Sequence, residues 1–337
     1  MAARVSPHWT EWLLGAAILA AVILAAVHFA EEREFIRLVE HAKPSWVLAA
    51  IALQAATYAA QGQIWRDIAA AGGQRVSLRE AFELSLAKLF VDQALPSGGV
   101  SGTILMGKAL ERRGLSRRTV VSGAISSTAA FYLSYVGGLS FAWAILARTP
   151  ESPAALSVSC GIFLAVSTAL ALAMLALPGR SLPHTLQFLN RSKSGQRFFA
   201  LLKIADPRLV RNARLLLRYT GWQIATLVLD AATIWALLCA TGGTVGVAAV
   251  IVGFMLASAV RTVGIVPGGL GTFEATLVWT LDSFGTPLAV GLTASLLFRG
   301  LSFWLPMLPG LWFSRQETGL RGSPSKQISS ALLGAAH

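Results

Sequence analysis

Long apolar runs cover most of the chain, and polar residues gather in short segments between them. Seven of these runs are close to or above the length of about 20 residues that a helix needs to cross about 30 Å of hydrocarbon. They are Trp12–Phe29, Trp46–Trp65, Val120–Ala147, Ala154–Leu177, Tyr219–Ala240, Val247–Val266 and Leu288–Phe313. The pattern therefore predicts an all-α polytopic membrane protein.

Two stretches interrupt this pattern with nearly the same cluster of proline and glycine, ALPSGGVSG at 94–102 and IVPGGLGT at 265–272. On either side of Pro96 lies a moderately apolar leg of about 14 residues, which reaches only about 21 Å as a helix and cannot span the membrane. We therefore expect two re-entrant helical hairpins, at about 81–110 and about 247–282. Their turns contain Pro96, Gly98, Gly99 and Gly102 in the first and Pro267, Gly268, Gly269 and Gly271 in the second.

The basic residues between the apolar runs predict the orientation. With a cytoplasmic N-terminus, segments 66–80, 111–118, 179–218 and 315–337 lie inside and carry 19 Lys and Arg, whereas the outer segments 30–45, 148–154, 242–246 and 283–287 carry 4. Positive charge is expected on the cytoplasmic side, so both termini are predicted to be cytoplasmic. The first hairpin then enters from inside and the second from outside. With about six full spans, this arrangement resembles the inverted-topology repeat of many transporters.

The chain reads as one transmembrane domain, 1–314, followed by a cytoplasmic tail, 315–337, that is expected to be disordered. We interpret the run at 12–29 as a retained span, because it is longer than a usual signal-peptide core and lacks a strongly basic segment before it. The cytoplasmic loop 179–218 carries nine basic residues and one acid, Asp206. Its stretch RLVRNARLLLR fits either an amphipathic helix on an anionic leaflet or a solvated loop.

Composition excludes several classes of protein. The chain is 55% hydrophobic and 13% charged, with a mean hydropathy of +0.62, and its net charge of +12 lies between apolar runs rather than on a nucleic-acid-binding domain. Cys160 and Cys239 lie within apolar segments, and the five histidines are scattered, so neither a disulfide nor a metal site is predicted. The sequence from Gly102 to Lys108 matches G-x-x-x-x-G-K, but Ala109 stands where a phosphate loop needs a hydroxyl. We therefore expect no enzyme and no cofactor.

The two proline and glycine clusters allow two interpretations. Irregular backbone at membrane depth leaves polar groups without partners and is tolerated only when it is buried in protein or lines a wet cavity. The clusters on opposite sides of the membrane therefore favour a shared cavity. The alternative is that proline and glycine only kink helices or allow close packing.

Six ionisable residues are expected at membrane depth, where charges usually pair, face the protein interior or mark a substrate path. Lys88 and Asp92 are four residues apart and fit a local pair. Arg261 precedes Pro267 by six residues and Glu274 follows it by seven, so both approach a common cavity if two helices meet at the turn. An arginine there suits a lipid phosphate. The candidate substrate-binding residues are Lys88, Asp92, Asp230, Arg261, Glu274 and Arg299.

These residues lie in two regions that resemble the membrane domain of lysylphosphatidylglycerol synthases, a family also described as flippase-like. The regions are ALPSGGVSGTILMGKALERRGLS and VRTVGIVPGGLGTFEATLVWTL, the latter followed by GLTASLLFRGLSFWLPMLPG. The resemblance extends over nearly the whole chain and implies movement of lipids between leaflets. The synthase domain of full-length relatives has no counterpart here, so translocation without synthesis is implied. Thr103 and Met106 stand where some relatives carry an arginine, which weakens the expectation of a charged headgroup contact there.

Two functions follow as hypotheses. The first is a lipid transporter or flippase that binds an anionic or phosphate-bearing headgroup between the two hairpins. The second is a non-transporting membrane partner of a separate lipid-modifying or glycolipid enzyme. An enzyme of headgroup transfer lacks its catalytic residues, and no ATP-binding motif is present.

Overall fold

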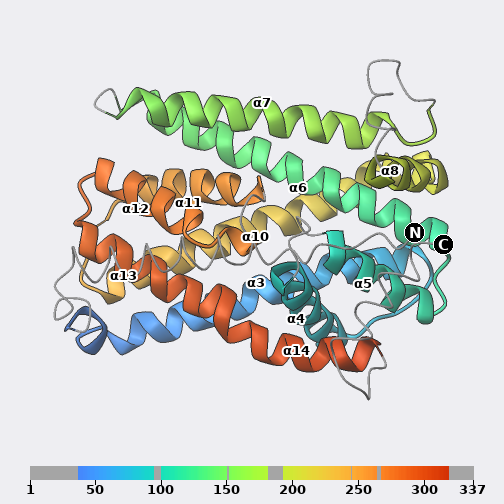
Figure 1. Cartoon of the computed structure of the whole chain (residues 1–337), viewed down its shortest axis with the longest axis horizontal. Helices are drawn as coiled ribbons and strands as arrows, with labels where there is room; N and C mark the ends of the chain where they lie inside the picture. Colours follow the sequence, from blue (N-terminus) through green and yellow to red (C-terminus); the bar gives the residue numbers. More distant parts are fainter. Residues whose placement is uncertain are drawn as a thin grey trace, which may run out of the picture.

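The computed structural model describes residues 37–94, 100–149, 152–180, 193–243, 245–263 and 267–318, and this part of the chain is entirely helical. Long helices run side by side along the long axis of the molecule (Figure 1). In chain order the α-helices are α3 (Pro44–Ala71), α4 (Leu78–Ala94), α5 (Val100–Arg112), α6 (Arg117–Leu146), α7 (Ala154–Ala176), α8 (Lys193–Ile204), α9 (Pro207–Val210), α10 (Ala213–Ala240), α11 (Val247–Thr262), α12 (Thr272–Ser283), α13 (Leu288–Arg299) and α14 (Leu305–Thr318). A 3₁₀ turn, η2 (Pro267–Gly269), precedes α12, and a π-helical turn, η3 (Gly300–Trp304), joins α13 to α14.

Four helical segments of the described chain are long and apolar enough to cross a membrane: Arg117–Leu146, Ala154–Ala176, Ala213–Ala240 and Leu288–Glu317. The expected span at 46–65 lies in α3, which has 28 residues and is long enough. Three glutamines, Gln54, Gln61 and Gln63, make α3 less apolar than these four. The expected span at 12–29 and most of the tail 315–337 lie outside the described residues.

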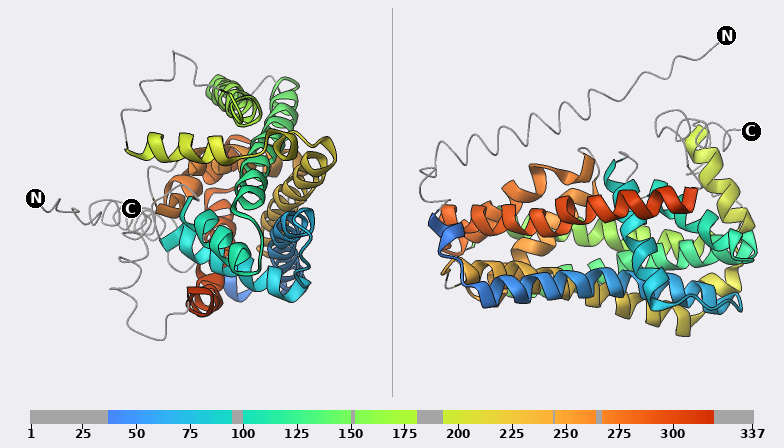
Figure 2. Two further views of the ribbon diagram at one scale, coloured as in Figure 1. Left: turned by 90° about the vertical axis from the view of Figure 1, so that its right-hand side faces the viewer. Right: turned by 90° about the horizontal axis from the view of Figure 1, so that it is seen from below.

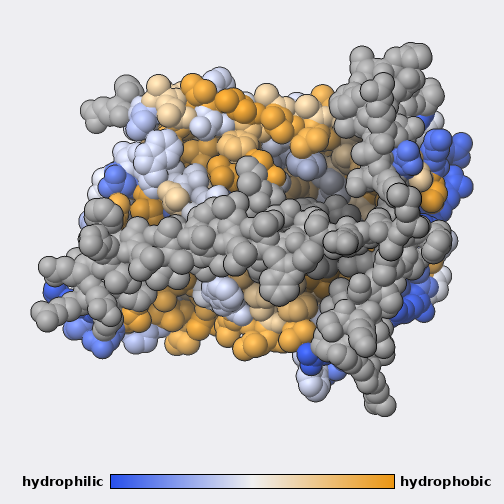
Figure 3. All heavy atoms as spheres, in the orientation of Figure 1, coloured by the Kyte–Doolittle hydropathy of each residue, from blue (hydrophilic) through white to orange (hydrophobic). Residues whose placement is uncertain are grey.

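Polar residues gather at the two ends of the long axis, and apolar residues cover much of the visible surface between them (Figure 3). The segments that were expected on one side of the membrane meet at one end. There Arg118 forms a salt bridge of 3.2 Å with Asp206, and Arg113 forms one of 2.8 Å with Glu317. Hydrogen bonds to Glu317 raise the pKa of Arg113 above its ordinary value, so its guanidinium stays protonated at neutral pH. At the opposite end the N–H of Lys43 donates to the carbonyl of Ala240.

The two interrupted regions both form pairs of short helices. α4 and α5 pack against each other and lie towards the basic end, where Glu80 near the start of α4 is 3.5 Å from Arg113, just after α5. α11 and α12 form the second pair towards the other end, with η2 between them (Figure 1). With 12 residues, α12 is about 18 Å long and shorter than the hydrocarbon thickness. Residues 95–99 and 264–266, which include Pro96, Gly98 and Gly99, lie outside the described chain.

The basic segment RLVRNARLLLR does not form one amphipathic helix, nor is it only a loop. Asp206 accepts from the N–H of Arg208 and starts the short α9, and Asn212 accepts from the N–H of Leu215 and starts α10. Both are N-caps, so the arginines are divided between two helices. The amphipathic helix of this region is α8, which precedes this segment.

Glycines let α4 approach its neighbours closely. A Cβ at Gly62 of α3 would lie 3.0 Å from the backbone carbonyl of Ala81. A Cβ at Gly310 of α14 would lie 2.5 Å from the carbonyl oxygen of Leu86. Backbone contact through small residues is a common way to pack membrane helices. The first helix of the first pair is therefore held between α3 and α14.

Candidate functional site

The centre of the candidate site is a buried ion pair between α13 and α12. The Nε of Arg299 donates to Oε1 of Glu274 over 2.6 Å, and its Nη2 donates to the carbonyl oxygen of Gly268 over 2.7 Å. Arg299 is 2% exposed and Glu274 is 0% exposed. The guanidinium thus links the last turn of α13, the first turn of α12 and the turn η2. A charge with this little access to water is tolerated because it is paired and hydrogen-bonded.

Aromatic rings surround the same guanidinium. The Cζ of Arg299 lies 4.7 Å from the ring centroid of Phe303 and 5.5 Å from that of Phe273. Phe273 also stacks on Phe298, with a centroid distance of 5.5 Å. Cation–π contacts are strongest where water is excluded, so these rings stabilise the charge that the fold has buried.

The turn at 267–271 has a backbone conformation that only glycine adopts readily. Gly268, Gly269 and Gly271 have φ angles of 63°, 65° and 79°. A Cβ at Gly268 would overlap the ring of Phe303, and a Cβ at Gly269 would overlap the side chain of Arg261. The three predicted glycines therefore provide both the positive φ and the space for two site residues.

Arg261, in the last turn of α11, differs from Arg299. It is partly exposed, and it has no salt bridge within the described part of the chain. Its Cζ lies 5.7 Å from the ring of Phe273, so one ring faces both guanidinium groups. Glu274 is already engaged by Arg299, which leaves Arg261 as the cation that is open to a further anion.

Asp230 in α10 is the second buried carboxylate near this site. Gln54 of α3 donates to its Oδ1 over 3.3 Å, whereas the hydroxyl of Thr57 donates to the carbonyl of Leu53 within α3. The charge of Arg261 acts favourably on Asp230 without a direct salt bridge. The structure thus brings Arg261, Glu274 and Arg299 together and places Asp230 within electrostatic range.

Lys88 and Asp92 form a separate cluster in the first helix pair. Their Nζ and Oδ2 atoms lie 2.5 Å apart, as the i,i+4 spacing predicted. The other oxygen, Oδ1 of Asp92, accepts from the N–H of Gly102 over 2.8 Å. Asp92 therefore caps the start of α5 from the end of α4. A Cβ at Gly102 would lie 2.7 Å from the carbonyl oxygen of Lys88, which explains the glycine at this place.

The π-helical turn η3 follows Arg299 directly and leaves two carbonyls without backbone donors. The N–H of Leu305 bonds to the carbonyl of Gly300, five residues back, and Pro306 has no N–H to offer. The carbonyls of Leu301 and Ser302 bond to other helices instead. Tyr58 of α3 donates its hydroxyl to Leu301 over 2.9 Å, and Gln93 of α4 donates its Nε2 to Ser302 over 3.4 Å.

We expect Tyr58→Phe to lower the free energy of unfolding by about 1–3 kcal/mol, because the carbonyl of Leu301 then has no donor. Thermal unfolding in detergent measures the change. Tyr132→Phe is the control, because that hydroxyl donates no hydrogen bond within the described residues. An equal effect of both substitutions would contradict the role of Tyr58 at the π-turn.

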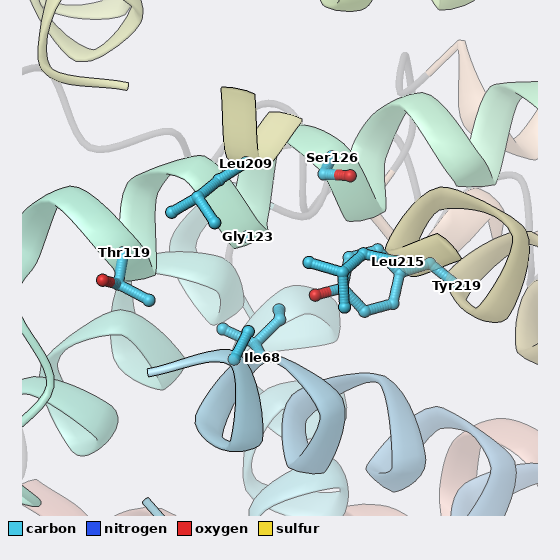
Figure 4. Close-up of a pocket in the computed structure, with 8 residues that line it drawn as sticks. Ile68, Thr119, Gly123, Ser126, Leu209, Leu215 and Tyr219 are labelled. Carbon is cyan, nitrogen blue, oxygen red and sulfur yellow. The ribbon is translucent and has the colours of Figure 1, made fainter. Parts of the chain in front are cut away.

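None of the candidate residues lines the small pocket between α3, α6 and the start of α10 (Figure 4). The residues around it are largely apolar: Ile68, Ala71, Thr119, Gly123, Ser126, Leu209, Leu215 and Tyr219. Among the described residues, no group of three His, Cys, Asp or Glu is suited to a metal ion. The chemistry of the site is thus that of charge, hydrogen bonding and aromatic contact.

Several residues of the site were not among the predicted ones. Phe273 and Phe303 could not be singled out, because aromatic residues are frequent in membrane helices. Gln54, Tyr58 and Gln93 could not be assigned a role, because their partners lie on other helices. One sequence signal indicates the two glutamines and the tyrosine: a polar side chain within an apolar helix needs a partner.

The fold and site define a multi-pass, all-α membrane protein with a buried ion pair at a break between its helices. The family model for the lysylphosphatidylglycerol synthase TM region matches residues 12–310. The chain belongs to this family. A comparison with curated proteins found no match.

Proposed function

We propose that the protein moves a phospholipid or a related lipid between the leaflets of a bacterial inner membrane. The observation that carries this proposal is the pair of arginines at the second turn. Arg299 is neutralised by Glu274, whereas Arg261 is partly exposed and has no salt bridge in the described chain. Membership of the family agrees with a function in lipid handling.

In this proposal Arg299 and Glu274 hold the turn, and Arg261 meets the phosphate of the headgroup. A guanidinium presents several donors in a fixed plane and suits phosphate oxygens. Asp230 lies within electrostatic range of Arg261 and provides a counter-charge when no lipid is bound. Lys88 and Asp92 hold the first helix pair on the other side of the path.

The path runs between the two helix pairs, which we propose to be re-entrant hairpins of opposite sidedness in an inverted repeat. The short length of α12 and the contact of η2 with α4 support this arrangement, because a turn that meets the other pair lies inside the protein. The basic end would face the cytoplasm, together with both termini.

Labelling of single cysteines tests this topology. Cysteines at Ala71 and Ser116 flank the first helix pair, and we expect both to react with a membrane-impermeant reagent from the cytoplasmic side. A cysteine at Ser152, between α6 and α7, should react from the outside. If Ala71 and Ser116 react from opposite sides, the first pair crosses the membrane and is not re-entrant.

Lipid movement in vesicles tests the role of Arg261. With Arg261→Gln we expect the flip of a labelled phosphatidylglycerol to be about tenfold to a hundredfold slower, because a hydrogen bond between charged groups contributes about 1.5–3 kcal/mol. Arg148→Gln serves as the control, because it removes an exposed arginine just after α6, at the end of the molecule opposite the basic end. Movement at the unaltered rate in a folded Arg261→Gln protein would rule out this site.

A non-transporting membrane partner of a lipid-modifying enzyme is the second candidate. The near-complete burial of Arg299 and Glu274 favours it, because a scaffold buries its polar groups against other helices. Vesicles that contain the unaltered protein distinguish the two functions. If no lipid moves, while the protein still binds lipid that mass spectrometry identifies after purification, the partner function is the better account.

A further inference from the structure

A second surface with chemistry of its own is that of α8 (Lys193–Ile204), which lies away from the arginine pair and is not used in the proposed function. The helix lies across the ends of the long helices, and one of its ends extends past them (Figure 2). The neighbouring spans α7 and α10 end and begin at this level, at Ala176 and Ala213. A helix that crosses the ends of membrane spans lies in the plane of the membrane surface.

The apolar residues of α8 divide into two groups. Phe199 and Leu202 are buried, together with Ile125 and Val210. Phe198 and Leu201 are 36% and 37% exposed. The helix therefore has an apolar strip that the rest of the described chain does not cover.

The position of α8 is fixed by contacts on its C-terminal side. The N–H of Asp206 donates to the hydroxyl of Ser122 over 2.8 Å, and the carboxylate pairs with Arg118. Arg211 donates to the carbonyls of Leu175, Ala176 and Pro178 at the end of α7. These contacts hold the segment that follows α8 against α6 and α7, and Phe199 and Leu202 pack α8 itself beside Ile125 of α6.

The segment that contains the strip is strongly basic. Segment 179–218 has nine basic residues and one acid, and that acid, Asp206, is already paired. Lys203 on α8 and Arg208 on the adjoining α9 are both exposed. A second copy of such a positive surface would be repelled, whereas a layer of anionic headgroups above acyl chains matches both the charge and the apolar strip.

We propose that α8 is an interfacial helix that docks on anionic lipid headgroups of the membrane in which the protein is embedded. Phe198 and Leu201 enter the boundary between headgroups and acyl chains, and Lys203 and Arg208 contact the lipid phosphates. This surface binds lipid from outside the helix bundle and does not depend on lipid movement through it.

A fluorophore on α8 tests the proposal in vesicles that contain only this protein. Phe198→Cys is labelled with an environment-sensitive dye in a background where Cys160 and Cys239 are replaced by alanine. We expect blue-shifted emission, quenching by lipids with a spin label near the headgroup, and protection from aqueous iodide. Emission as in water, with full quenching by iodide, would overturn the proposal and leave the strip to a protein partner.

The charge of the headgroup is tested with the same labelled protein. The blue shift should be larger in vesicles of phosphatidylglycerol than in vesicles of phosphatidylcholine. Lys203→Gln with Arg208→Gln should remove most of this difference, whereas Arg148→Gln at the opposite end should leave it unchanged. If the double substitution leaves the difference intact in a protein of normal thermal stability, the anionic part of the proposal is wrong. Because lipid movement is not measured, this result is independent of the proposed function.

Discussion

Replacing Arg299 by glutamine is expected to lower the free energy of unfolding by about 3–5 kcal/mol, the largest loss for any single substitution at the second turn. The change removes the partner of a fully buried carboxylate and the donor to the carbonyl of Gly268. The other oxygen of Glu274, Oε2, has no hydrogen-bond partner among the described residues. Glu274 would then be left as an uncompensated charge, which is the costly state of a buried pair. Thermal unfolding of the purified protein measures the loss.

The pairing itself is tested by removing both charges. The double variant Arg299→Gln with Glu274→Gln should be more stable than Arg299→Gln alone, because no unpaired charge remains. Arg79→Gln provides the control, since Arg79 forms an Arg–Glu pair with Glu83 but its side chain is 89% exposed. Its loss should leave stability almost unchanged. A double variant no more stable than Arg299→Gln would show that the two side chains do not act as a pair.

Replacing Gly269 by alanine is the second substitution with a large expected effect, a loss of about 2–5 kcal/mol. The φ of 65° strains any residue with a Cβ, and that Cβ would overlap Arg261. The turn or the arginine must move, so we expect a lower unfolding temperature together with slower lipid movement.

Gly221→Ala is the matched control for this substitution. Gly221 lies within α10, and a Cβ there would meet no atom within 4 Å. Alanine is favoured over glycine in a helix interior by roughly 0.5–1 kcal/mol, so this variant should be as stable as the original protein or more so. Equal tolerance at both positions would reduce the turn at 267–271 to an ordinary kink.

The helical membrane fold and the family were predictable because both depend on local pattern. Apolar runs and the glycine turns are contiguous in sequence, and the all-helical structure and the family match confirm these predictions. The approach of Arg261 and Glu274 to a common place was also predicted, from their spacing around Pro267. The sequence did not predict which arginine pairs with Glu274, because this depends on which arginine the packing buries.

Contacts between helices that are distant in the sequence could not be predicted. Pro306 implies that a carbonyl near Ser302 lacks its donor, but nothing in the chain identifies Tyr58 and Gln93 as the side chains that replace it. An amphipathic helix was one of two interpretations of 208–218, and the spacing of the arginines that suggested it does not show that Asp206 and Asn212 each cap a helix. The cap residues interrupt the helix despite a favourable periodicity.

The close contacts of α4 determine which part of the molecule can rearrange. Gly62 and Gly310 bring α3 and α14 against the backbone of α4, and backbone atoms cannot rotate out of the way as side chains do. The second helix pair is packed differently, since Gly138 of α6 faces the flexible side chain of Met255 on α11. The first pair and its two neighbours thus form one tightly packed unit. If lipid moves between the pairs as proposed, the opening requires α11 and α12 to move relative to this unit.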